Sequence, residues 1–338
     1  MAAGRKNLRR VQLGLESTAG TAVAATTIWR GPAVGFDELS EVVQVEEQVG
    51  IFDGLDRDAI SVLFAGMELP DQPLTFEQFP YILALAYGGP VTGVQDGAGT
   101  GYVYTTTIPT TAGPTTPRRY TVEGGDDSEN EEMEYAHCTA FTIKGEHKGL
   151  TMFNASLRGR QINDSTVTPA LAIPAVEDSV VSMGLVYIDA IGGTFGTTQV
   201  SAQILAFEIT HEIMWVPKWA IDGNKYFSHL VYAGHKITGK LTFEHDTAVK
   251  RSGGAKSEFE ARTAKKLRIS LLGSALTTPA THATKKVNFD MPIKYIKVGT
   301  LDEMDGNDIV DMEFRSRYNA TAADQGSIVV VNQVTALP

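Results

Sequence analysis

The sequence predicts a mainly β protein of two tandem β-sandwich or barrel domains, each with one short flanking helix. Three observations predict this fold: several stretches alternate apolar with polar residues, helical periodicity is confined to two short segments, and the order of these elements occurs twice. The length of 338 residues favours about two domains, and 43% hydrophobic residues are ample for a core. The rest of the chain is expected to form long loops and an N-terminal arm.

Strict alternation marks three stretches of the second half, residues 205–213, 236–244 and 310–318. In the second of these, Ile237 and Leu241 point to one face, while lysines, threonines and a glutamate point to the other. Such a pattern is typical of an antiparallel strand with one buried and one wet face. We therefore predict a strand in each stretch.

Helical signals are few. Four apolar residues stand at i, i+3, i+4 and i+7, namely Phe79, Ile82, Leu83 and Ala86. Before them Thr75 and Gln78 resemble a capping box, and the run Gly88-Gly89-Pro90 should end the helix. A second S-x-x-E box, Ser257 with Glu260, predicts a helix over about residues 257–264.

The same order of elements occurs in each half. A strand, at 60–68 or 236–245, leads through a loop into the short helix. Further strands are expected at 102–108, 119–123, 139–146 and 150–160 in the first half, and at 266–272, 287–291, 293–298 and 309–318 in the second. This weak repeat predicts a first domain with an N-terminal arm at 1–162, a linker at 163–178 and a second domain at 179–338.

The formal net charge of −11 argues against a protein that grips nucleic acid, whose phosphates attract lysine and arginine. It does not argue against one that lets nucleic acid pass. Two predicted long loops, residues 39–58 and 124–134, carry acidic runs. These runs supply candidate inter-subunit or lumen residues: Glu46, Glu47, Asp53, Asp126, Asp127, Glu129, Glu131 and Glu132. Candidate inter-subunit bases are Arg5, Lys6, Arg9, Arg10, Lys250, Arg251, Lys265 and Lys266. Each run is either a solvated face or a surface that meets its opposite on another copy.

Motifs of catalysis and of metal binding are missing from the sequence. Cys138 is the single cysteine, so no intramolecular disulfide can form. His211 and Glu212 begin like a zinc H-E-x-x-H motif, but Trp215 stands where the second histidine is needed. Asp305-Gly306 indicates a tight hairpin turn. We expect no catalytic residues, no metal and no cofactor, and the longest uncharged runs are too polar to cross a membrane.

Several segments, in their order along the chain, resemble bacteriophage tail tube proteins. The matching segments are residues 11–29, 54–57, 76–83, 186–189 leading to 196–200, 311–318 and 326–332. The resemblance implies stacked rings of subunits around a lumen. Each tube domain is then a β-sandwich or barrel with one flanking helix, and its sheet joins those of its neighbours to line an acidic channel through which DNA passes.

The resemblance therefore predicts a self-assembling structural subunit of a phage tail tube, not an enzyme. It is expected in the virion, after synthesis in the bacterial host cytoplasm. Its expected partners are other copies of itself, the tape measure, the tail terminator and the distal tail protein. A duplicated chain favours a trimeric ring of pseudo-sixfold symmetry over a hexameric one. The alternatives are another virion β-protein, such as a decoration or fibre module, and an uncharacterised hydrolase.

Overall fold

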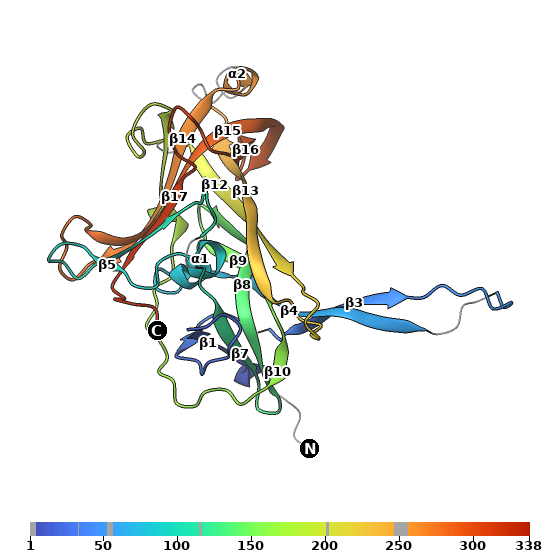
Figure 1. The fold of residues 1–338 in the computed structure, drawn as a ribbon. Coiled ribbons are helices and arrows are strands. Elements are labelled where there is room, and N and C mark those ends of the chain that lie inside the picture. The colour runs from blue at the N-terminus through green and yellow to red at the C-terminus, as the bar shows by residue number, and fades with distance from the viewer. Residues whose placement is uncertain (1–4, 33, 53–56, 115–116, 201–202, 247–255) are drawn as a thin grey trace.

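The computed structural model describes residues 5–32, 34–52, 57–114, 117–200, 203–246 and 256–338, which form a mainly β fold (Figure 1). Within these residues lie seventeen strands and two α-helices, and the strands form one large antiparallel sheet. The predicted fold class, mainly β with few helices, is thereby confirmed.

The first half contains a 3-10 turn, ten strands and the longer helix. They are η1 (Lys6–Leu8), β1 (Arg10–Leu15), β2 (Thr27–Trp29), β3 (Asp37–Gln44), β4 (Asp58–Pro73), α1 (Phe79–Tyr87), β5 (Val94–Gln95), β6 (Tyr102–Thr107), β7 (Tyr120–Gly125), β8 (Asn130–Glu146), β9 (Met152–Gly159) and β10 (Ile162–Asp164). Two predicted loops are wrong in part. The acidic stretch 39–58 begins and ends in the paired strands β3 and β4, and most of 124–134 belongs to β7 and β8.

The second half follows the predicted order more closely. Its elements are η2 (Val181–Met183), β11 (Leu185–Ala190), β12 (Ile204–Lys218), β13 (His229–Glu244), α2 (Lys256–Glu260), β14 (Ala264–Ala275), β15 (Thr284–Met304), β16 (Asn307–Ser316) and β17 (Ser327–Asn332). The predicted turn is confirmed, because Asp305 and Gly306 have φ angles of 54° and 85° and join Met304 to Asn307 across a hairpin.

One long strand, β15, replaces the two that were predicted on either side of Pro292. Along one edge, Lys286–Asp290 pair with β17, and the pairing with β16 begins at Ile293. Pro292 lies at this change of partner, where the missing N–H need not interrupt a ladder on that edge. The proline was therefore a poor signal for a strand end.

The strands of both predicted domains continue into one another. The main run is β3-β4-β9-β8-β12-β13-β16-β15-β14-β11. β15 also pairs with β17, which continues to β6 and β5, and a smaller group is β2-β1-β7-β8-β10. The halves are thus joined at β8–β12 and at β6–β17, and their buried side chains form one cluster. The division at 163–178 stays a prediction.

Helix α1 lies at the centre of this core, with strands around it (Figure 1). All nine of its residues are buried, as expected for a helix that is apolar on every side. The Phe79 ring contacts Phe141 and Phe153 of the first half and Phe289 of the second, with centroids 5.9–6.3 Å apart. The helix therefore holds the two halves together.

The ends of α1 only partly match their predicted caps. At the C-terminus Gly88 takes a φ of 67°, and its N–H bonds the carbonyl of Ala84, as predicted. At the N-terminus the Gln78 N–H donates to Thr75 Oγ1 at 3.3 Å, but the Gln78 side chain turns away. It bonds the backbone of Ile28 and Arg30 at 2.9 and 3.1 Å. The capping box is therefore half formed, and Gln78 fastens β2 to the helix.

Candidate functional site: the protruding hairpin and the polar sheet face

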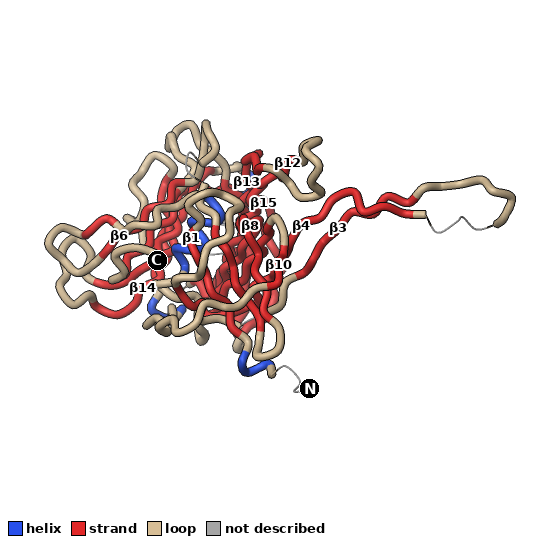
Figure 2. Tube along the Cα trace, turned by 60° about the horizontal axis from the view of Figure 1, so that its bottom comes forward, coloured by secondary structure: helices blue, strands red, loops and turns tan. Residues whose placement is uncertain are grey.

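The most prominent surface feature is the β3–β4 hairpin, which extends away from the body (Figures 1 and 2). Its strands pair from Asp37–Gly66 outward to Gln44–Asp58. Within the described chain β3 pairs with β4 alone, so its other edge is open. Seven large apolar residues on the hairpin are exposed: Val42, Val43, Val45, Val49, Ile51, Phe52 and Ile60. Exposed apolar side chains gathered on one element are typical of surfaces that bind other molecules.

The root of the hairpin is anchored, which fixes its direction. The Leu63 N–H donates to the Lys225 carbonyl at 3.0 Å, and the Phe64 ring meets Trp219 edge-on at 6.5 Å. Further along β4, Ala65 is fully buried and pairs with Gly159 of β9. The root of the hairpin is therefore packed against the rest of the chain.

The predicted acidic residues on the hairpin lie beyond the end of β3. Glu46 is exposed, and Glu47 forms an ion pair with Arg57 of the same hairpin. Asp53 lies outside the described residues. The hairpin thus combines exposed carboxylates with exposed apolar side chains.

The second acidic run is held by its own chain. Asp126 Oδ1 accepts backbone N–H bonds from Ser128 and Glu129, which lower the pKa of its carboxyl. Asp127 accepts the Arg5 N–H at 2.9 Å, and Glu132 accepts the Ser165 hydroxyl at 3.0 Å. These carboxylates already have partners within one chain.

The N-terminal arm lies against this run. Arg9 lines a cavity of about 130 Å³ with Asp126, Glu129 and Glu131. Burial, with Glu129 nearby, raises the pKa of Glu131. The next residue, Arg10, pairs with Gly125 at the start of β1, and Lys6 is exposed in η1. Two runs that were predicted to be either solvated faces or contacts between copies therefore meet, in part, within the chain.

The other predicted bases are also partly engaged. Lys265 forms an ion pair with Glu258 at 2.9 Å. Lys266 donates to the Gly193 carbonyl at 2.7 Å and lies 4.8 Å from the Phe195 ring centroid. Lys250 and Arg251 lie outside the described residues. Lys265 is therefore paired with a carboxylate of its own chain, whereas Lys266 contacts a carbonyl and an aromatic ring.

A ladder of alternating charge, which the sequence reasoning missed, crosses the outer face of the sheet. Directly opposite residues on five adjacent strands are Lys144, Glu208, Lys240, Glu313 and Lys297. The first comes from the first half and the other four from the second. Opposite charges at facing positions contribute roughly 0.2–1 kcal/mol per pair. The alternation of the strands predicted a polar face, but the register that aligns these charges could not be predicted from the sequence.

Neighbouring groups complete the neutralisation of this ladder. Lys297 lies 2.5 Å from Glu313, Lys240 lies 3.1 Å from Asp311, and Lys144 lies 2.5 Å from Asp71. Each base along the row therefore has a carboxylate within contact distance. The face is polar and wet, and both halves contribute to it.

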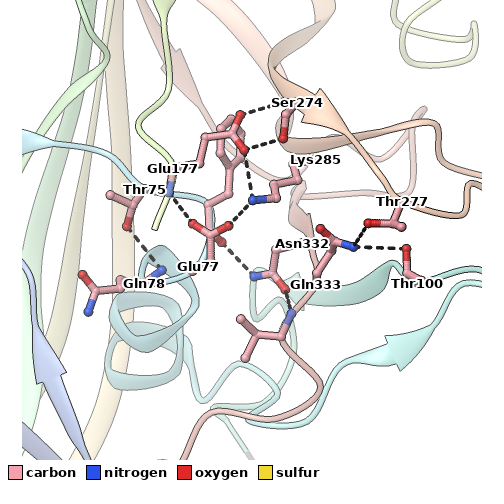
Figure 3. Close-up of polar contacts among 12 residues, drawn as sticks. Thr75, Glu77, Gln78, Thr100, Glu177, Ser274, Thr277, Lys285, Asn332 and Gln333 are labelled. Carbon is pink, nitrogen blue, oxygen red and sulfur yellow. Dashed lines mark hydrogen bonds and ion pairs between the residues drawn. The ribbon is translucent and has the colours of Figure 1, made fainter. Parts of the chain in front are cut away.

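A second cluster that the sequence reasoning missed surrounds the partly buried amine of Lys285 (Figure 3). Lys285 Nζ lies 2.6 Å from Glu77 and 2.9 Å from Glu177, and Ser274 donates its hydroxyl and N–H to Glu177. The Glu177 N–H donates to Glu77 at 2.8 Å. Burial opposes the charge on Lys285, but the bonds to the two glutamates outweigh it and raise the pKa of Lys285. The cluster ties the predicted linker to both halves.

Two histidines are buried in the core. His211 Nδ1 lies 2.8 Å from Tyr87 Oη, and the His211 ring stacks on Phe141 with centroids 4.5 Å apart. Burial lowers the pKa of His211 to about 3, and burial with the nearby charge of Arg119 does the same for His137. Both rings are therefore neutral at pH 7, as structural core histidines are.

Acidification should destabilise the fold through these histidines. An unfolded histidine binds its proton near 6.5 and the folded one near 3, so their contribution is complete above pH 6.5 and falls progressively below it. The loss is up to about 1.4 kcal/mol per pH unit for each histidine. His211→Phe keeps an aromatic ring against Phe141 and should flatten the dependence between pH 6.5 and 4. Urea unfolding at several pH values measures this, with exposed His229→Phe as the control. An unchanged pH slope would contradict it.

The described residues offer little for catalysis. No group of three or more His, Cys, Asp or Glu among them could hold a metal ion, and Cys138 is buried, which raises the pKa of its thiol. Neither described helix has the length and apolar character needed to cross a bilayer. That the chain is not an enzyme stays a prediction.

Comparison with known proteins adds no family assignment. No protein-family model matches the chain, and no curated protein matches it significantly.

Proposed function

We propose that this protein is a structural subunit that assembles with copies of itself into the tube of a bacteriophage tail. The observation that carries the proposal is the β3–β4 hairpin, with its open edge and exposed apolar side chains on an anchored root. A two-stranded ribbon is marginal in water alone, so it needs a second surface to cover it. Another copy is the partner that a tube supplies.

The continuous sheet supports a wall to which both halves contribute. β8 of the first half pairs with β12 of the second, and the charge ladder crosses that joint. We propose that this polar face lines the lumen. The bases of the ladder lie beside carboxylates, and the chain is acidic overall, so passing DNA phosphates would find few free cations there. A basic lumen in an electrostatic map of the assembled ring would overturn this.

The sequence resemblance extends the proposal. The chain is then a virion protein, with the tape measure, tail terminator and distal tail protein as further partners and DNA as non-specific cargo in transit. The ring is a trimer of pseudo-sixfold symmetry, because each chain would supply two wall segments. A hexameric ring with the second half outward is the alternative. A decoration or fibre module is the second candidate function, since an exposed hairpin would suit it too.

Negative-stain microscopy of the purified protein at high concentration tests the proposal. Hollow tubes whose averages show three chains per ring, with both halves at the lumen, are expected. Spikes or particles that remain monomeric at every concentration would reject the tube. Six chains per ring would reject the trimer alone.

Phe52→Asp in the hairpin should abolish assembly without unfolding the subunit. Phe52 is fully exposed, so the change costs the isolated chain little, but a charge in a desolvated contact costs several kcal/mol. Sedimentation velocity should then show folded monomers under conditions where the unaltered protein sediments as large assemblies. Ile221→Asp is the matched control, because Ile221 is similarly exposed but lies between β12 and β13, outside the hairpin. Assembly of the Phe52 variant at the normal concentration would count against the hairpin's role.

A further inference from the structure

Beside the charge ladder lies a cleft whose three cations form no ion pair with any described residue. A cavity of about 190 Å³ is lined by Lys294, Arg315 and Arg317, and a cavity of about 570 Å³ continues from it through Arg317 and Tyr318. Among the described residues that line the two cavities there is no aspartate or glutamate. This is notable in a chain with 40 acidic and 29 basic residues.

The register of β15 and β16 places two of these positive charges directly opposite each other. Lys294 stands directly opposite Arg315 in the β15–β16 pair, and like charges at facing positions are destabilising. Along the same two strands, Lys297 faces Glu313 and forms an ion pair. In the described part of the chain, the ion pairs of this face do not include the three cleft cations. The pattern of alternating charge is therefore interrupted here by two facing cations, whereas the other like-charge pair of these two strands, Glu303 facing Asp308, is acidic.

We propose that this cleft binds the acidic β3–β4 hairpin of a second copy of the chain. The hairpin carries the exposed carboxylates of Asp37, Glu38, Glu41 and Glu46, and of its glutamates only Glu47 is in an ion pair among the described residues. The other acidic run, around Asp126, already has partners in its own chain. Charge complementarity thus selects the hairpin.

The chain's own hairpin cannot be the occupant. Five strand steps separate β4 from β16 in the sheet, about 24 Å at 4.8 Å per step. The hairpin also points away from the body (Figure 1). A hairpin from another copy is therefore required.

The inference rests on the proposed self-assembly and names the contact within it. Docked carboxylates would restore the alternation that Lys294 and Arg315 interrupt. The exposed Tyr318 ring at the junction of the two cavities would cover part of the valine-rich ribbon.

Charge reversal separates binding from folding. Arg315→Glu should raise the concentration for half-maximal assembly at least about tenfold, because it sets a carboxylate against the incoming carboxylates. The same change places a glutamate opposite Lys294, so the melting temperature of the dissociated subunit should be equal or slightly higher. A residue with only a structural role would not lower assembly while preserving stability. Lys218→Glu, which makes the same change of charge at an exposed lysine of β12, is the control.

Mixing completes the test. The double variant Glu41→Lys, Glu46→Lys should also assemble poorly alone, and an equimolar mixture with the Arg315→Glu protein should recover assembly. If the unaltered protein and both variants all assemble alike, the cleft inference fails and the tube proposal stands. If the unaltered protein never assembles, both fail. If the Arg315→Glu protein loses binding to a labelled DNA duplex while its assembly is unchanged, the cleft holds nucleic acid and the inference is overturned.

Discussion

Phe79→Ala should lower the free energy of unfolding by about 3–5 kcal/mol, the usual cost of removing a fully buried phenylalanine ring. The effect should be at the upper part of this range, because the Phe79 ring contacts Phe141, Phe153 and Phe289 from three different strands. The remaining cavity would be framed by large rigid rings that cannot easily close it.

The same variant should also reveal whether the halves unfold together. Trp29 lies in the first half and Trp215 in the second, and both are buried, so single-tryptophan versions can report on each half separately. We expect one urea transition, shifted equally for both probes, since Phe79 packs against both halves. Phe52→Ala is the matched control and should leave stability unchanged, because Phe52 is fully exposed. A shift seen by only one tryptophan would show that the halves unfold independently.

Lys285→Met should cost about 2–4 kcal/mol, because it leaves two poorly solvated carboxylates without their cation. The side chains of Lys285 and Glu77 are 14% and 8% exposed, whereas Glu177 at 28% keeps some water. Urea unfolding at pH 7 measures the loss. Lys297→Met removes an exposed ion pair with Glu313 and is the control, for which we expect about 0–1 kcal/mol.

The pH dependence of this loss has a definite sign. Burial raises the pKa of Glu177, but hydrogen bonds from Ser274 and Lys285 outweigh it and hold the pKa below its ordinary 4.5. Its contribution is therefore present above pH 4.5 and is lost as the pH falls through the folded-state pKa. The difference between the unaltered protein and Lys285→Met should shrink at acid pH, and Glu77→Gln should partly rescue the variant. An equal difference at pH 7 and pH 4 would contradict this account.

The elements with a strong local period could be predicted from the sequence. Helix α1 is confirmed from Phe79 onward, because its apolar spacing and Gly88 are local signals. Strands β12, β13 and β16 were predicted for the same reason, although each proved longer or shifted at its ends. These segments bury one face or all faces, and burial leaves a pattern in the sequence.

The parts that could not be predicted depend on contacts distant in the chain. Strand β3 buries neither of its faces fully, so its sequence, DELSEVVQ, has no clear alternation of apolar and polar residues. For that reason the sequence predicts an acidic loop there. The ladder from Lys144 to Lys297 needs the register of five strands, which no local pattern contains. The cleft around Arg315 was missed for that reason too. Glu177 was placed in a linker, where nothing indicated that it would meet Lys285.

The two joints between the halves have a mechanical consequence. If the halves were joined only by the pairing of β8 with β12, they could rotate about that pair of strands. The second pairing, of β6 with β17, and the packing of α1 against both halves prevent this rotation. A ring of three such chains would contain six halves. Every second angle between neighbouring halves would then lie within one chain and be fixed when that chain folds. Only the alternate angles would be left to contacts between copies. The curvature of the ring would then be set largely within each subunit. Deviations from the angle that closes the ring would arise at three interfaces between chains instead of six.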